Sequence, residues 1–241
     1  MNLGKLKLAM PASLLAVALL AAACSETGET QNESEGADLN GATSAEVFLR
    51  MGAGDLDLTG GSDRMLDAGF TYNVEDWDPQ VDWDVSNGHG RLEIDQSGSG
   101  SVSLFDLDDI ENEWDLSLND DIPMTLDVEL GAGDGTLNLG SLTLTRLDVQ
   151  TGAGETTIDL TGDWANDLDA TVEAGVGRVK LLLPADVGVR VETDTGIVDM
   201  DHDGLTKDGD VYTNDAFGVS DATLTINVDA GVGQVELEVV Q

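Results

Sequence analysis

The residues with the clearest chemical spacing lie in the stretch DMDHDGLTKDGD, residues 199–210. Carboxylates at alternate positions of a tight loop can converge on one calcium ion, and a following glycine permits the sharp turn. Against a calcium loop, the last acid is an aspartate where the longer glutamate is usual, and no helix is predicted on either side. An aspartate-rich chain also produces such strings by accident. Calcium stands as the one candidate cofactor, with the candidate ligands Asp199, Asp201, Asp203 and Asp210.

A Gly-x-Gly motif recurs along the chain and is first seen in LRMGAGDLDL, residues 49–58. A phosphate-binding loop would need a helix N-terminus behind it, to aim backbone N–H groups at the anion. Each motif is followed instead by an alternating segment such as DLDL, TLNL or TIDL. We therefore predict structural corners and no nucleotide site. The predicted corner glycines are Gly52, Gly54, Gly88, Gly90, Gly131, Gly133, Gly152, Gly154, Gly175, Gly177, Gly231 and Gly233.

Enzymatic chemistry has no support in the remaining residues. His89 and His202 stand alone, without a cysteine or second histidine at metal-ligand spacing. No serine lies in a nucleophile elbow, and no Gly-x-x-x-x-Gly-Lys loop is present. We therefore predict no catalytic residues and a protein that is not an enzyme. Four tryptophans are interpreted as packing residues, with carbohydrate stacking as the alternative: Trp77, Trp83, Trp114 and Trp164.

The segments that position the glycines share one apolar pattern. Counted from the first glycine of each motif, the positions five before, three before and six after are apolar in every copy. The residues between them are mostly polar, and such alternation on both sides of a glycine is typical of strand, turn and strand. A degenerate copy places Asp194 at the first glycine and Gly196 at the second.

The spacing of the corners predicts the architecture. Successive corners lie about 20 residues apart, or about twice that, which indicates coils of about 20 residues with two coils in each longer gap. Helical periodicity is absent after residue 45. We predict an all-β, single-domain, parallel β-helix-like solenoid whose end coils need protection. An antiparallel β-sandwich is the alternative, because the same units can form hairpins.

The N-terminus has the pattern of an exported lipoprotein. Lys5 and Lys7 precede an apolar run that is too short to cross a bilayer core of about 30 Å, so residues 1–23 are predicted to be a lipoprotein signal peptide. Cys24, the only cysteine, follows Leu-Ala-Ala-Ala as in a bacterial lipobox. We predict lipidation of Cys24 and anchoring to the membrane through it. An ordinary secretory signal is the alternative.

The rest of the chain divides into two parts by composition. Residues 24–45 are polar and acidic, and they are predicted to form a flexible tether. Residues 46–241 carry the alternating pattern and are predicted to form the folded β-solenoid domain.

The charge of the chain restricts its partners. The sequence holds 48 acidic and 10 basic residues, a formal net charge of −38. Such a chain repels nucleic acid and anionic lipid head groups, so neither is expected as a partner. The acids are scattered over the whole chain. This favours a solvated surface suited to a saline habitat over broad binding of divalent cations.

Several stretches together carry a family resemblance. They include MGAGDLDLTGGSDRMLDAGFTYNVEDWDPQVDW, GHGRLEIDQ, the segment from NEWDLSLND to TTIDLTGDW, and LPADVGVRVETDTGIVDMDHDGLTKDGDVYTNDAFG. With them the chain resembles the bacterial toast-rack family of envelope proteins of unknown function, which is related to the C-terminal domain of cell-wall-active-antibiotic response proteins. The resemblance implies a right-handed β-helix-like fold, an envelope location and no catalytic residues. Some relatives act in envelope-stress signalling beside a membrane sensor kinase, but this chain lacks their transmembrane helices.

Two functions of different classes follow. The first is a lipid-anchored, non-catalytic envelope protein, in which a rigid acidic solenoid acts as a structural or protein-interaction module linked to envelope stress, with an envelope protein as partner. The second is a ligand-binding or sugar-active β-helix protein with a calcium site. A concave groove lined by tryptophan would favour the second function, and a uniformly acidic surface would favour the first.

Overall fold

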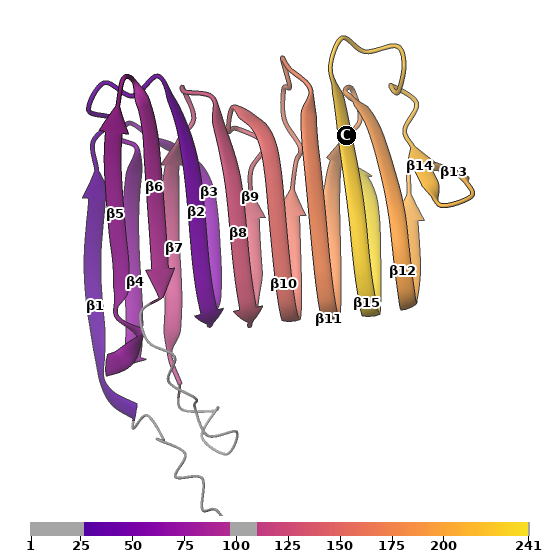
Figure 1. The fold of residues 1–241 in the computed structure, drawn as a ribbon. Coiled ribbons are helices and arrows are strands. Elements are labelled where there is room, and N and C mark those ends of the chain that lie inside the picture. The colour runs from indigo at the N-terminus through magenta and orange to yellow at the C-terminus, as the bar shows by residue number, and fades with distance from the viewer. Residues whose placement is uncertain (1–26, 97–109, 241) are drawn as a thin grey trace, which may run out of the picture.

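The computed structural model describes residues 27–96 and 110–240, which form β-strands and one turn of 3-10 helix, η1 (Glu75–Trp77). Figure 1 shows the strands stacked side by side in two layers. The strands are β1 (Thr27–Ala37), β2 (Ser44–Ala53), β3 (Asp55–Ser62), β4 (Leu66–Val74), β5 (Pro79–Ser86), β6 (His89–Gln96), β7 (Asn112–Asn119), β8 (Met124–Ala132), β9 (Gly135–Asn138), β10 (Leu144–Asp159), β11 (Leu168–Pro184), β12 (Gly188–Asp203), β13 (Thr206–Asp208), β14 (Val211–Thr213) and β15 (Thr223–Val240).

The middle of the molecule is a stack of parallel coils. In the first layer β2, β8 and the N-terminal halves of β10, β11, β15 and β12 pair in parallel, in that order. In the second layer β3, β9 and the C-terminal halves of the same long strands also pair in parallel. Each long strand passes from one layer to the other at a glycine corner. This parallel pairing excludes the antiparallel sandwich as a description of the central coils.

Antiparallel strands occupy both ends of the stack, where the sequence predicted additional coils. Between Gly52 and Gly131, β4 pairs antiparallel with β1 and β7, and β5 pairs antiparallel with β6. In the same part of the chain, β6 and β7 pair in parallel with β2 and β3. The long gap before Gly231 contains β13 and β14, and β15 then returns to lie between β11 and β12. The prediction of two coils in each longer gap is therefore wrong. Antiparallel strands need only short connections, and they cover end strands that would otherwise expose unpaired backbone.

The core consists of aliphatic ladders between the two layers. Most of the apolar positions found by aligning the corners are at most 2% exposed, among them Leu49, Val128 and Ile158. Burying one such side chain contributes about 1.5–3 kcal/mol to stability. The exceptions are Trp83 and Val85 in the β5–β6 hairpin and Met200 in the end strand β12, which are half-buried. The ladders thus weaken only where the stack ends.

The stretch predicted as a flexible tether contains a strand, which corrects the boundary at residue 46. β1 pairs antiparallel with β4, from Gln31 opposite Tyr72 to Ala37 opposite Leu66. The Tyr72 hydroxyl also donates a hydrogen bond to Glu33, at 3.0 Å. Backbone pairing of this kind needs no apolar alternation in β1 itself, so a polar composition did not reveal the strand. Cys24 and the predicted signal peptide lie outside the described residues.

The motif at Gly88 and Gly90 is a hairpin turn and not a corner of the stack. Ser86 pairs with His89 across a two-residue turn, in which Asn87 and Gly88 have φ of 54° and 79°. Positive φ at both central residues is typical of the tight turns that join antiparallel strands. Gly90 lies against the ring of Trp83, where any Cβ would overlap the indole. A hairpin and a corner share the same strand–glycine–strand pattern, which explains the error.

The degenerate copy in β12 is aligned two residues away from its predicted position. Gly196 stacks on the first glycine of its neighbour, Gly231, and Asp194 lies opposite Asp229. Gly196 therefore replaces the first glycine of the motif and not the second.

Candidate functional site

The glycine corners stack directly on one another along one edge of the molecule. A Cβ on Gly154 would overlap the carbonyl oxygen of Gly133 in the preceding coil, and the same holds at the other stacked corners. Gly154 also has φ of 138°, in the left-handed region that favours glycine. The glycines thus let neighbouring coils approach at the bend. The first glycines follow in the order Gly52, Gly131, Gly152, Gly175, Gly231 and Gly196.

The residue after the second glycine links each coil to the next. The Asp55 carboxylate accepts a hydrogen bond from the backbone N–H of Asp134 at 3.3 Å, and the Asp134 carboxylate accepts one from Glu155 at 2.9 Å. Further along, Arg178 forms an ion pair with Glu155 at 3.4 Å and donates to Gln234 at 3.1 Å. The acid in the Gly-Ala-Gly-Asp motif is therefore a structural acceptor in this stack.

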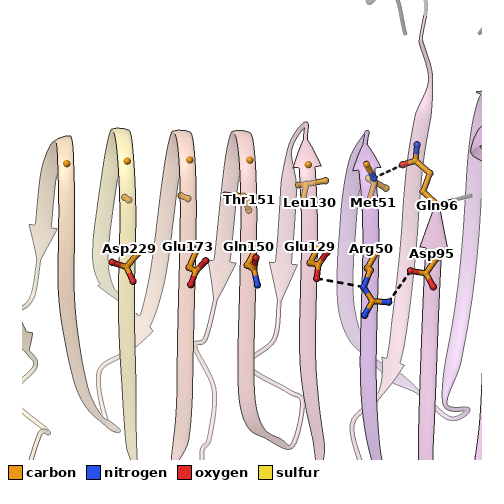
Figure 2. Close-up of a pocket in the computed structure, with 18 of the residues that line it drawn as sticks. Arg50, Met51, Asp95, Gln96, Glu129, Leu130, Gln150, Thr151, Glu173 and Asp229 are labelled. Carbon is orange, nitrogen blue, oxygen red and sulfur yellow. Dashed lines mark hydrogen bonds and ion pairs between the residues drawn. The ribbon is translucent and has the colours of Figure 1, made fainter. Parts of the chain in front are cut away.

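A shallow groove follows the corners on the side of the first layer, and we call it the corner groove. It encloses about 1070 Å³ and extends from β6 to β12. Its floor is made by the first glycines and by the residues just before them, such as Leu130 and Ala174. Figure 2 shows polar side chains of adjacent strands in a single row beside these corner residues. The row consists of Asp95, Arg50, Glu129, Gln150, Glu173 and Asp229, and Asp194 follows in register.

Charge is unevenly distributed along this row. Arg50 donates a hydrogen bond to Asp95 at 3.1 Å and lies 3.7 Å from Glu129, and the hydrogen bond to Asp95 raises the pKa of Arg50. At the other end, Glu173, Asp229 and Asp194 follow one another, and within the described residues no lysine or arginine pairs with them. Because neighbouring strands lie about 4.8 Å apart, these three carboxylates form a closely spaced acidic segment.

The corner groove has the chemistry of a binding surface. Its lining offers carboxylates, the amides of Gln96 and Gln150, the guanidinium of Arg50 and exposed backbone, and among the described residues it includes no histidine, cysteine, lysine or serine. Gln96 already accepts hydrogen bonds from the backbone N–H groups of Gly52 and Ala53, at 2.8 and 3.2 Å. The free acceptors suit a ligand that carries cationic or N–H donor groups along an extended backbone.

A match to a known family model shows which protein family the chain belongs to. Residues 26–182 match the family described as the N-terminal domain of toast-rack. The chain belongs to the toast-rack family. Residues 132–237 also match the C-terminal domain of the cell wall-active antibiotics response protein LiaF. In the part of the toast-rack chain that the structure describes, no helix is long and apolar enough to span a membrane.

Some solved structures resemble this toast-rack chain. A proposed cell adhesion protein from Clostridium sporogenes is 29% identical, covers 88% of this chain and 100% of its own, and has a TM-score of 0.82. A proposed adhesin from Bacteroides fragilis is 13% identical over 87% of this chain and 97% of its own, with a TM-score of 0.30. The second likeness is too weak to inform either fold or function. No curated protein matches the chain.

The candidate calcium ligands do not converge in the toast-rack stack. Asp199, Asp201 and Asp203 lie on the extended strand β12, where alternate residues are about 6.8 Å apart, and Asp210 lies in the turn before β14. Calcium ligands must approach one ion to about 2.3–2.6 Å, which an extended strand does not allow. Within the described ranges, no group of three or more His, Cys, Asp or Glu residues is placed to hold a metal ion. The calcium-loop hypothesis assumed a loop where the chain continues a strand.

The tryptophans pack within the toast-rack stack, and none of the described residues that line the corner groove is aromatic. Trp77 and Trp114 are buried, at 4% and 1% exposure. Trp83 and Trp164 are half-buried and donate their indole N–H groups to the backbone oxygens of Asp38 and Leu160, at 2.9 and 2.8 Å. These contacts support the packing interpretation. The groove residues themselves were not predicted, although Arg50, Glu129, Gln150, Glu173 and Asp229 each lie two positions before a corner glycine.

Proposed function

We propose that this toast-rack protein is a non-catalytic, envelope-associated interaction module that binds a partner along the corner groove. One observation carries the proposal: side chains from seven adjacent strands form a single row along a groove of about 1070 Å³. The inner strands of this row, β2, β8, β10, β11 and β15, are fixed by parallel pairing on both sides, so their part of the row is preorganised for binding. The proposed adhesive role of the Clostridium sporogenes protein, which shares the fold at 29% identity, supports this class of function.

The chemistry of the row indicates the kind of partner. The acidic segment of Glu173, Asp229 and Asp194 favours a protein with basic or amide side chains over a nucleic acid or an anionic lipid. The groove lining that the structure describes has no aromatic side chain, which argues against sugar binding by stacking. An extended segment of an envelope protein fits both the length of the groove and its charge.

Anchoring forms the second part of the proposal. Lipidation of Cys24 would hold the right-handed stack at the surface of a bacterial membrane, and the acidic surface would suit a saline habitat. The match to the LiaF C-terminal domain supports a link to the response to envelope stress. Labelling with an alkyne fatty acid tests the anchor: the full chain should incorporate the label, and Cys24→Ser should incorporate none. Equal labelling of both would contradict it.

Site-specific photocrosslinking on intact cells tests the groove. A photoreactive residue replaces Gln150 in the middle of the groove or, as the control, the exposed Thr136 on the second layer. A partner in the groove should yield a discrete crosslinked product at position 150, at least about fivefold above position 136. Glu173→Lys should reduce this product about fivefold, since it reverses charge within the acidic segment. Equal products at both positions, or no effect of Glu173→Lys, would contradict groove binding.

A further inference from the structure

The C-terminal end of the stack leaves one strand edge open. β12 pairs along its whole length with β15 on one side. On the other side β14 covers only Arg190 to Glu192, and the backbone N–H of Thr193 makes the next contact, to the oxygen of Asp210 at 3.0 Å. Within the ranges the structure describes, no strand pairs with residues 194–203 on that side. Figure 1 shows this edge at the right-hand end, below β13 and β14.

The core is also incompletely covered at this end. Val198 and Met200 point inward from β12 but are only partly buried, unlike Val235 on the neighbouring strand, which is fully buried. Ile197 at the corner is 80% exposed, and it continues a row of exposed apolar side chains with Val232 and Val176 on the adjacent strands. A strand added to β12 would bury apolar surface and satisfy backbone groups together.

The outward face of the same edge is strongly acidic. Asp199, Asp201 and Asp203 alternate along it, and they lie in register with Gln234, Glu236 and Glu238 on β15. Lys180 contacts Glu236 at 2.9 Å and Glu238 at 2.7 Å, and among the described residues no lysine or arginine forms an ion pair with Asp199, Asp201 or Asp203. An added strand with basic side chains on this face would therefore meet complementary charge.

Charge also disfavours a second copy as the occupant. Among the described strands, the unpaired edges at the opposite end of the stack belong to β1 and β5, whose exposed side chains include Glu33, Glu35, Asp82 and Asp84. Pairing either edge with β12 would place acids opposite acids, which is unfavourable. Acidic residues on an edge are a common protection against such self-association. The same residues attract a basic segment.

We propose that residues 196–203 of β12 are an acceptor site for strand addition by an extended, basic segment of a partner protein. Apolar residues of that segment alternate with lysine or arginine, so that the apolar side chains cover Val198 and Met200 while the basic side chains face Asp199, Asp201 and Asp203. The site adjoins the corner groove at Gly196, but its charged residues Asp199, Asp201 and Asp203 are not part of the groove lining, and Glu173→Lys leaves them unchanged.

Peptide binding to the full chain tests the charge requirement. The probe is a fluorescent seven-residue peptide in which lysine alternates with valine, followed by fluorescence anisotropy. Asp201→Lys should weaken binding about tenfold, and Asp57→Lys, an exposed acid on β3, should change it less than about twofold. A peptide with glutamate in place of lysine should not bind. Equal weakening by both variants would overturn the proposal, because it would indicate attraction to net charge alone.

Backbone methylation tests strand addition itself. Methylating alternate nitrogens of the peptide in one phase removes the N–H groups that face β12, whereas the other phase removes only those that face solvent. One phase should abolish binding and the other should leave it nearly unchanged. Equal effects of both phases would overturn strand addition. Sedimentation gives a further test. Dimers of the chain that dissociate in the Asp201→Lys variant would also overturn the proposal, because a second copy would then occupy the edge.

Discussion

At the scale of single residues, Gly154 shows why the repeated motif needs glycine. Alanine there would combine a left-handed backbone with an overlap between its Cβ and the Gly133 oxygen. Since that oxygen belongs to the stacked coil, neither partner can move alone. We expect Gly154→Ala to lower the free energy of unfolding by at least about 2 kcal/mol, measured by urea denaturation.

Gly209 provides the matched control for this prediction. It has φ of 64°, and a Cβ there would meet no atom within 4 Å. Gly209→Ala should therefore cost only the left-handed backbone penalty of about 1 kcal/mol. If the two variants lost equal stability, the close approach of the coils would not be the reason for the glycine ladder.

Asp127 gives a residue-scale prediction about pH. Burial, and then the neighbouring carboxylates of Glu129 and Asp148, raise the pKa of Asp127 in the folded protein. The folded state therefore binds this proton more tightly than the unfolded state, and stability is lost as the pH rises through the raised pKa. Asp127→Asn should stabilise the protein at pH 7, by less than about 1 kcal/mol because the group is partly solvated.

Thermal unfolding across pH measures this effect. The gain in Tm from Asp127→Asn should disappear as the pH falls below the ordinary aspartate pKa of about 4, where the wild-type carboxyl is also neutral. Asp57→Asn on the exposed face of β3 serves as the control and should show no such gain. A loss of stability at pH 7 in Asp127→Asn would contradict the assignment.

At the scale of elements, β1 makes a prediction that separates a strand from a tether. Residues 31–37 pair with β4, so their inward amide protons are hydrogen-bonded in the folded protein. We expect native-state hydrogen exchange to be slowed at least about 100-fold at alternate amides in this segment relative to an unstructured peptide. A flexible tether would exchange at the unstructured rate throughout.

Tyr72→Phe refines the test of β1. The variant removes the hydroxyl that donates to Glu33 at 3.0 Å and also lies 3.2 Å from Asp78, while the ring stays in the core. Exchange in β1 should become faster, and exchange in the central strand β10 should be unaffected. Equal acceleration in both strands would show a global loss of stability and no specific docking of β1.

The same elements show what the sequence could predict about the fold. The central coils repeat one pattern, because each coil must place aliphatic residues such as Val149 and Ile158 against the same positions of its neighbours. That repetition made the parallel stack predictable. The end strands obey other constraints: β1 pairs through its backbone, and the Asn87-Gly88 turn shares its local pattern with a true corner. Local pattern alone could not separate these cases.

The corner groove could not be predicted for a different physical reason. Its row of side chains arises when Glu129, Gln150 and Glu173 come into register on neighbouring strands, although they are separated along the chain. No single segment shows this arrangement. Given the parallel register, the aligned position two before the first glycine does contain Arg50, Glu129, Gln150, Glu173 and Asp229, but it misses Asp95 and Asp194 at the two ends of the row. The candidate site is thus a property of the stack and not of any one motif.

At the scale of the whole molecule, the formal charge of −38 acts against the compact stack. Acidic side chains of successive coils lie on neighbouring strands about 4.8 Å apart and therefore repel one another. Raising the ionic strength weakens this repulsion. Raising the salt from about 0.1 M to 1 M shortens the screening length from about 10 Å to about 3 Å. The folded state, which concentrates the charge, gains more from this screening than the unfolded chain does.

We therefore expect Tm to rise by about 5 °C or more between 0.1 M and 1 M NaCl, equivalent to about 1–2 kcal/mol for a domain of this size. KCl at equal ionic strength should give the same rise, because general screening does not distinguish the two cations. Millimolar CaCl₂ should not give the full rise in Tm, since the extended aspartates of β12 offer no convergent site for a divalent cation. This measurement separates general screening from specific cation binding. A Tm that does not change with NaCl would contradict salt adaptation, and a full rise in millimolar CaCl₂ would show that specific divalent binding stabilises the stack instead.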